Sequence, residues 1–165
     1  MLKENKDILK KAYPHVWNRL KLLEDTEQNF SIHIEETRQG NKTLWTEKDG
    51  KKVYIHSKYN PIREAETIVE EYEDIEPNTT VIFYGTGLGY HIDLFLKKHP
   101  HVSYYIYEPI PEMLYMYLSY NSLTKLPSLN LKDIILGDDE ETIRSFLKNL
   151  IDKTSGEFIQ ISLNS

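Results

Sequence analysis

The chain has 165 residues, enough for one domain with a buried core. Apolar residues make up 39% of the sequence and charged residues 28%, which is typical of a globular protein. There is no cysteine, which excludes disulfides and cysteine-based zinc sites, and the net charge of −6 argues against nucleic-acid binding. No segment has the length and apolarity of a membrane helix or of a signal peptide, so we expect no membrane partner.

The first 57 residues predict helices followed by a small antiparallel sheet. Apolar residues recur at helical spacing over residues 2–24, and Pro14 predicts a division of this stretch into two segments. Short strands with glycine-containing turns between them follow at residues 30–35, 43–45 and 53–55. We therefore treat residues 1–57 as an amino-terminal helical and small β subdomain.

From residue 58 onward the pattern changes to alternating helices and strands. Asn60 fits the N-cap of a helix, and Pro61 fits its first position. Beyond this helix, strands alternate with helices at residues 80–84, 90–98, 103–107, 112–120, 133–136, 140–151 and 157–162. This alternation predicts an α/β fold, a Rossmann-like parallel sheet with helices on both faces. Because its first strand is the most apolar, we expect that strand at the centre and the order 3-2-1-4 along the sheet. Residues 58–165 are thus predicted to be a Rossmann-like domain, in a fragment of a longer protein.

A glycine-rich turn, residues 85–89, lies between the first strand of this sheet and its helix. Glycine lets the backbone approach a ligand closely, and the start of a helix offers N–H groups that suit a phosphate or carboxylate. Acids that follow the second and third strands belong to the same edge, where a carboxylate can bind ribose hydroxyls. The predicted ligand-binding residues are Gly85, Thr86, Gly87, Gly89, Glu108, Asp138, Lys58 and Tyr59. The expected ligand is a nucleotide or nucleotide-sugar; the alternative is a tight turn whose glycines serve packing alone.

Two more specific interpretations fit the glycine turn incompletely. A dinucleotide-binding fold requires a third glycine at position 90, which is Tyr90. S-adenosylmethionine-dependent methyltransferases match the glycine spacing better, but they carry an acid at the position of Phe83. The sequence identifies no catalytic residue: His56 and Ser57 are adjacent and point to opposite faces of an extended chain. The histidines show no metal-ligand spacing, so we predict no metal site.

Three stretches of the chain share a recognisable pattern. The first is residues 5–23, with Asn5, two lysines and Pro14 at fixed spacing; the second is Ile55-His56-Ser57-Lys58-Tyr59-Asn60-Pro61 with the acids behind it. The third runs from residue 83 to 91, through the glycine turn, and continues with Tyr105-Ile106-Tyr107-Glu108-Pro109. In order and spacing these stretches resemble the motility-associated factor (Maf) family of flagellin-modifying glycosyltransferases.

The resemblance implies that this chain is the amino-terminal domain of a cytoplasmic protein of the bacterial flagellum system. Such proteins transfer nonulosonic acids from CMP-activated donors to Ser or Thr of flagellin, with the chemistry in a central domain beyond residue 165. The implied partners are flagellin and the catalytic domain of the same longer chain, and the domain itself is expected to bind a ligand or to act as a scaffold. Two alternatives remain: a methyltransferase-like domain, and a domain that docks flagellin through exposed aromatic side chains.

Overall fold

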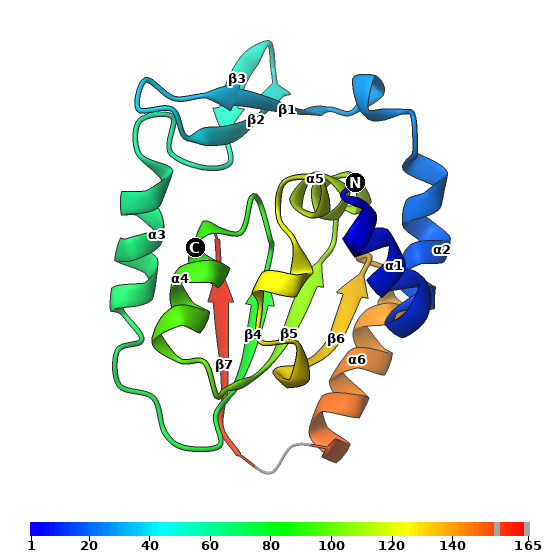
Figure 1. Cartoon of the computed structure of the whole chain (residues 1–165), viewed down its shortest axis with the longest axis vertical. Coiled ribbons are helices and arrows are strands. Elements are labelled where there is room, and N and C mark those ends of the chain that lie inside the picture. The colour runs from blue at the N-terminus through cyan, green and yellow to red at the C-terminus, as the bar shows by residue number, and fades with distance from the viewer. Residues whose placement is uncertain (154–155, 164–165) are drawn as a thin grey trace.

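A computed structural model describes residues 1–153 and 156–163 of the chain (Figure 1). The fold is α/β, with a four-stranded parallel sheet of order β6-β5-β4-β7 and a separate three-stranded antiparallel sheet of order β1-β2-β3. The parallel strands are β4 (Thr80–Tyr84), β5 (Ser103–Glu108), β6 (Leu131–Leu136) and β7 (Phe158–Ser162). The fold class and the predicted strand order are both confirmed.

Helices cover both faces of the parallel sheet, as predicted. Along β4, Val81 and Phe83 enter the larger hydrophobic core, which includes α4 and α5, whereas Ile82 enters a smaller core formed with α6. The four helices of this part are α3 (Pro61–Glu70), α4 (Tyr90–Lys98), α5 (Pro111–Tyr120) and α6 (Glu140–Lys153). Strand β6 begins two residues earlier, and α6 ends two residues later, than the sequence predicts.

The amino-terminal helices pack into the larger core rather than forming a core of their own. Helix α1 (Lys3–Ala12) and α2 (Pro14–Leu20) meet at Pro14, the first residue of α2, so the predicted division at this proline is confirmed. Leu9, Val16 and Leu20 are fully buried in the core that also holds Phe83. The division of the chain into an amino-terminal subdomain (residues 1–57) and a Rossmann-like domain (residues 58–165) therefore remains a proposal. A short 3-10 helix at Lys21–Leu23 lies within the stretch predicted to be helical, and further 3-10 helices that the sequence did not predict lie at Glu27–Asn29, Leu123–Lys125 and Ser128–Asn130.

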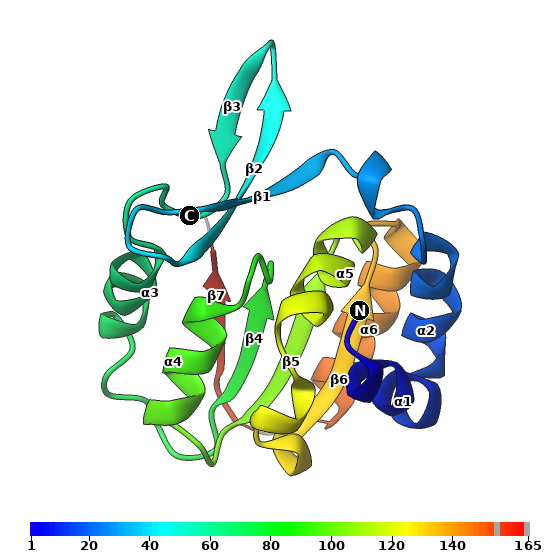
Figure 2. The same cartoon turned by 45° about the horizontal axis from the view of Figure 1, so that its top comes forward.

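The small antiparallel sheet consists of β1 (Ile32–Glu36), β2 (Lys42–Lys48) and β3 (Lys51–Tyr54). Leu44 is buried on the inner face of this sheet. The next residue, Trp45, points to the opposite face, where it pairs with His33 of β1 and with Tyr54 of β3. The hairpin turn has φ of 52° at Asp49 and 73° at Gly50, the left-handed conformations that a two-residue hairpin favours. Figure 2 shows the β2–β3 hairpin standing away from the rest of the protein.

The antiparallel sheet lies beyond the carboxyl ends of the parallel strands (Figure 1). The register pairs Tyr84 with Tyr107 and Glu108 with Leu136, so the ends of β4, β5 and β6 meet at this edge. Ligands of open α/β sheets bind at the carboxyl edge. The glycine turn between β4 and α4 is therefore placed where a ligand site was expected, directly beneath the small sheet.

Candidate functional site

The glycine turn has the backbone geometry that its glycines make possible. Gly85, Gly87 and Gly89 have φ of 88°, 49° and 77°, in the left-handed region that other residues enter only at a cost. Gly89 is the N-cap of α4, so the chain turns directly from the end of β4 into the helix. This local structure follows from the sequence alone.

The N–H groups of the turn are bound within the protein. Four of the five backbone N–H groups of residues 85–89 donate hydrogen bonds to protein acceptors. The bonds are Gly85 to the Tyr107 carbonyl at 2.8 Å, Thr86 to the Glu108 carboxylate at 2.8 Å, Leu88 to the His56 imidazole at 2.7 Å, and Gly89 to the Thr86 carbonyl at 2.8 Å. A helix terminus binds an anion through free N–H groups. In the turn itself, four of the five N–H groups already have protein partners.

Protein side chains also occupy the space beside the glycines. A Cβ at Gly87 would overlap the imidazole of His56 and the side chain of Leu163, and a Cβ at Gly89 would overlap the ring of Tyr117. The glycines thus allow these three side chains to approach the backbone. This arrangement favours the packing interpretation of the turn.

Glu108 closes the turn from the end of β5. Its side chain is 3% exposed, and it accepts hydrogen bonds from the Thr86 N–H, from the Thr86 hydroxyl at 3.1 Å and from the Ile110 N–H at 3.0 Å. Burial raises the pKa of Glu108, while these hydrogen bonds act to lower it. Both carboxylate oxygens are therefore engaged by the chain itself at the position where a ribose was expected.

His56 is the residue whose structural role the sequence did not reveal. It is 2% exposed, and its Nε2 accepts the Leu88 N–H; the neutral ring therefore carries its proton on Nδ1, which lies 3.3 Å from Glu64 Oε1 and donates to it. The second Glu64 oxygen accepts the Ser57 N–H at 3.0 Å. No hydrogen bond joins His56 to Ser57 within the described residues, so the pair does not form a nucleophile and base.

His91, on the first turn of α4, lies inside the core. It is fully buried against Phe83, with ring centroids 6.1 Å apart, and neither of its nitrogens has a hydrogen-bond partner in the described chain. Burial lowers the pKa of His91 to about 4; nearby His56 also lowers it, while the adjacent Gly85 backbone acts in the opposite direction. The ring is therefore neutral at physiological pH.

The remaining predicted ligand residues lie apart from the turn's hydrogen-bond network. Asp138 is exposed after β6, and its neighbour Asp139 caps α6 by accepting the Thr142 N–H at 2.8 Å. The Lys58 ammonium lies 5.0 Å from the ring of Tyr59, which is 70% exposed. Among the residues with assigned positions, no hydrogen bond joins these side chains to the turn. The structure thus brings together Gly85, Thr86, Gly87, Gly89 and Glu108, but not Asp138, Lys58 and Tyr59.

Two surface hollows lie away from the glycine turn. One, of about 800 Å³, is at the amino ends of the parallel strands, and the other, of about 550 Å³, lies between α4 and the segment that follows α5. None of the predicted ligand residues lines either hollow.

In residues 1–153 and 156–163, no group of three or more His, Asp or Glu side chains is placed to hold a metal. Over the same residues, no helix combines the length and the apolarity needed to span a membrane.

Aromatic side chains occur both in the core and on the surface. Tyr115, Met116, Tyr117 and Leu118 of α5 are buried, so they serve packing. In contrast, the outer face of the antiparallel sheet carries stacked polar and aromatic groups, which we call the outer aromatic face: His33, Trp45, Lys52 and Tyr54. There the Trp45 ring lies 4.4 Å from the centroid of His33, and the Lys52 ammonium lies 4.4 Å from the Trp45 ring.

The glycine turn, its hydrogen-bond partners His56 and Glu108, and the outer aromatic face lie on a segment that runs from β1 through the glycine turn into β7. A family model described as the Glycosyltransferase Maf N-terminal domain matches residues 33–160, which is this same segment. No curated protein sequence and no solved structure matches the chain. Since the match covers well over half of the 165 residues, including both sheets and the clamped glycine turn, the chain belongs to the family of Maf glycosyltransferase N-terminal domains.

Proposed function

We propose that this domain is a non-catalytic scaffold of a cytoplasmic flagellin glycosyltransferase. One observation carries the proposal: four of the five N–H groups of the glycine turn, and both oxygens of Glu108, are bound by the protein's own groups. A nucleotide that bound the N–H groups of the turn or the Glu108 carboxylate would have to displace these bonds, each of which is costly to leave unmade in a buried site. The turn acts as a junction between the two sheets.

The scaffold presents flagellin to the catalytic domain of the same longer protein, which attaches nonulosonic acids to it. The outer aromatic face supports this role, because Trp and Tyr are enriched among the residues that dominate protein interfaces. It lies on a sheet that projects from the body, and Trp45 stays partly exposed there between His33 and Lys52. A methyltransferase function is less well supported, since Phe83 is fully buried where those enzymes carry a cofactor-binding acid.

The nucleotide alternative is tested by an NMR titration that reports each backbone amide. The ligands are CMP, a CMP-nonulosonate, a UDP-sugar, NAD and S-adenosylmethionine. We expect the amide signals of residues 85–89 to stay unchanged, because those groups keep their internal partners. A saturable shift of these signals with one ligand would contradict the scaffold proposal and identify the turn as that ligand's site.

Flagellin docking is tested by calorimetric titration of the protein with unmodified flagellin. We expect binding that Trp45→Ala weakens about tenfold or more, the effect of losing one interface aromatic. Trp17→Ala is the matched control, because Trp17 is the chain's other tryptophan and lies on α2 beside Lys10. Absence of binding by the unmodified protein, or equal weakening by both substitutions, would refute docking through the outer aromatic face.

A further inference from the structure

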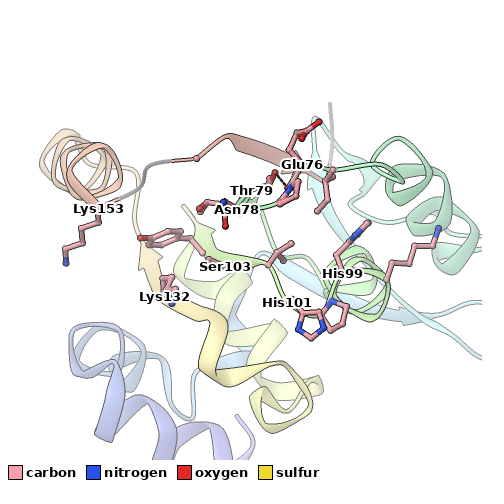
Figure 3. A pocket seen from close by; sticks show the side chains of 16 residues that line it. Glu76, Asn78, Thr79, His99, His101, Ser103, Lys132 and Lys153 are labelled. Carbon is pink, nitrogen blue, oxygen red and sulfur yellow. Dashed lines mark hydrogen bonds between the residues drawn. The ribbon is translucent and has the colours of Figure 1, made fainter.

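The hollow of about 800 Å³ lies at the edge of the parallel sheet opposite the glycine turn (Figure 3). It is formed where the strands begin: by the loops that precede β4 and β5, by the start of β6, by Lys153 at the end of α6 and by Gly156. Polar side chains line it, among them Asn78, Thr80, Ser103, Lys132 and Lys153. It shares no lining residue with the glycine turn, so its role has to be argued separately.

The lining of this hollow is basic, although the chain as a whole has a net charge of −6. Among the described residues that line it, Glu76 is the one carboxylate, against the basic side chains of Lys98, His99, His101, Lys132 and Lys153. Figure 3 shows Lys132 and Lys153 on the α6 side and the two histidines on the opposite side, with Asn78 and Ser103 between them. Such a distribution of charge favours the binding of an anion.

Two of these basic groups already have partners. The Lys98 ammonium lies 3.8 Å from a Glu73 oxygen, and His99 Nε2 donates to the Tyr72 carbonyl at 2.9 Å. In the portion of the chain with described positions, Lys132 and Lys153 form no ion pair. These two ammonium groups are therefore the ones available to a ligand.

Lys132 reaches the hollow through an irregularity of the sheet. Leu131 pairs with Tyr104, and Asp133 pairs with Tyr105, so Lys132 is an extra residue of β6 that has no partner on β5. A bulge of this kind bends a strand and redirects a side chain, and bulges are frequent beside functional sites. Without the bulge, the regular alternation of side chains along β6 would orient the Lys132 side chain differently.

Several described residues around the hollow are held in place by contacts within the chain. Asn78 has a φ of 67°, and Gly156 packs so closely on the Asn78 carbonyl that a Cβ would overlap it. The Thr79 hydroxyl donates to the Glu76 carbonyl at 2.6 Å, and the Asn130 amide donates to the Pro100 carbonyl at 3.0 Å. A site that is held in place before binding loses less entropy when a ligand enters.

We propose that this hollow binds the phosphate group of a small organic phosphate of nucleotide size. Lysine ammonium groups bind phosphate as point charges, and the hydroxyls of Thr80 and Ser103 and the amide of Asn78 supply further donors. The volume lies in the range of small-molecule sites, roughly 300 to 1,000 Å³. This binding site is additional to the scaffold role, and either can fail without the other.

The test is calorimetric titration with inorganic pyrophosphate, with uridine diphosphate and with uridine, at constant ionic strength. We expect saturable binding of the two phosphates, none of uridine, and weakening by about tenfold or more in Lys132→Glu and in Lys153→Glu. Lys148→Glu is the matched control, because it makes the same charge change at an exposed position of α6 outside the hollow. Thermal melts without ligand verify that the variants fold.

Site-resolved NMR distinguishes this site from the glycine turn. We expect both phosphates to shift the amide signals of Ser103 and Lys132, while those of residues 85–89 stay in place. No binding, equal weakening in all three lysine variants, or shifts confined to residues 85–89 would overturn the proposal. Shifts at residues 85–89 would also overturn the scaffold function, whereas simple absence of phosphate binding would leave that function standing.

Discussion

The backbone N–H of Leu88 donates a 2.7 Å hydrogen bond to Nε2 of His56, a residue 32 positions earlier in the chain. On the other side of the same residue, the Leu88 carbonyl accepts from the Asn121 amide at 2.9 Å. The Leu88 residue is therefore clamped between the segment that leaves the antiparallel sheet and the end of α5. These two bonds hold the glycine turn in the form in which its N–H groups face protein rather than ligand.

The His56 clamp should contribute strongly to stability. In His56→Ala, the buried Leu88 N–H loses its acceptor, the partly exposed Glu64 loses a donor, and the ring leaves a cavity beside Gly87. We expect the free energy of unfolding, measured in urea, to fall by about 3 kcal/mol. His101→Ala removes an exposed ring and should change the free energy of unfolding by less than about 0.5 kcal/mol. Similar losses in the two variants would show that the clamp contributes little.

The close approach of Tyr117 to Gly89 gives a second prediction, with its own internal control. Gly89→Ala and Gly50→Ala both place a side chain at a φ near +75°, which costs about 1 to 2 kcal/mol. Only at Gly89 does the new Cβ overlap another group, the Tyr117 ring; at Gly50 nothing lies within 4 Å. Overpacking adds about 1 to 3 kcal/mol, so Gly89→Ala should be the more destabilising of the two by that amount in urea unfolding. Equal effects would mean that the ring moves aside freely.

The elements that the sequence predicts correctly are those whose signals are local. The alternation of strands and helices, the apolar run of β4 and the glycines between β4 and α4 are short patterns with one structural meaning each. Topological rules for parallel sheets then fix the strand order with little remaining choice. The identity of the glycine turn as a tight strand-to-helix connection was therefore predictable.

The partners of that turn were not predictable, because they come from distant parts of the chain. His56 reaches Leu88 only because the antiparallel sheet lies over the carboxyl edge, and nothing local to residue 56 specifies that placement. The same holds for Tyr117 beside Gly89. The bulge at Lys132 has no local signal either, since it exists only as a mismatch of register with β5.

Asn5 provides a third prediction, and a physical reason for one residue of the family pattern. This side chain is fully buried in α1; its amide donates to the Leu118 carbonyl at 2.8 Å and the Asn121 carbonyl at 2.6 Å, and its oxygen accepts the Leu123 N–H at 2.8 Å. Asn5→Ala leaves the Asn121 carbonyl and the Leu123 N–H without these partners, while the Leu118 carbonyl keeps the hydrogen bond from the Leu2 N–H.

We expect Asn5→Ala to lower the free energy of unfolding by about 3 kcal/mol, since each unsatisfied buried group costs about 1 to 3 kcal/mol and water can reach some of them. Asn18→Ala, at an exposed position of α2, is the control and should have little effect. Amide hydrogen exchange should also speed up at Leu123, which loses its acceptor. Unchanged exchange at Leu123 would contradict the assigned hydrogen bond.

Buried His91 makes the stability of the fold depend on pH in a predictable direction. Its pKa in the folded protein is lowered to about 4 from an ordinary value of 6.5 by burial, so the unfolded chain binds the proton more tightly. The stability that this neutral ring supplies is therefore complete above pH 6.5 and is lost as the pH falls from 6.5 toward 4. Between pH 7.5 and pH 5, the linkage relation gives a loss of about 2 kcal/mol from this residue.

His91→Phe keeps an aromatic ring against Phe83 and removes the titration. We expect the variant to lose about 2 kcal/mol less than the unmodified protein when urea unfolding is compared at pH 7.5 and pH 5. The two nitrogens of His91 have no hydrogen-bond partner among the described residues, so the substitution breaks no such bond and should cost little at pH 7.5. His101→Phe, on the surface, should keep the pH dependence of the unmodified protein. If the unmodified protein and His91→Phe lose the same stability on acidification, other groups must cause that loss, and the neutral, buried state assigned to His91 would be wrong.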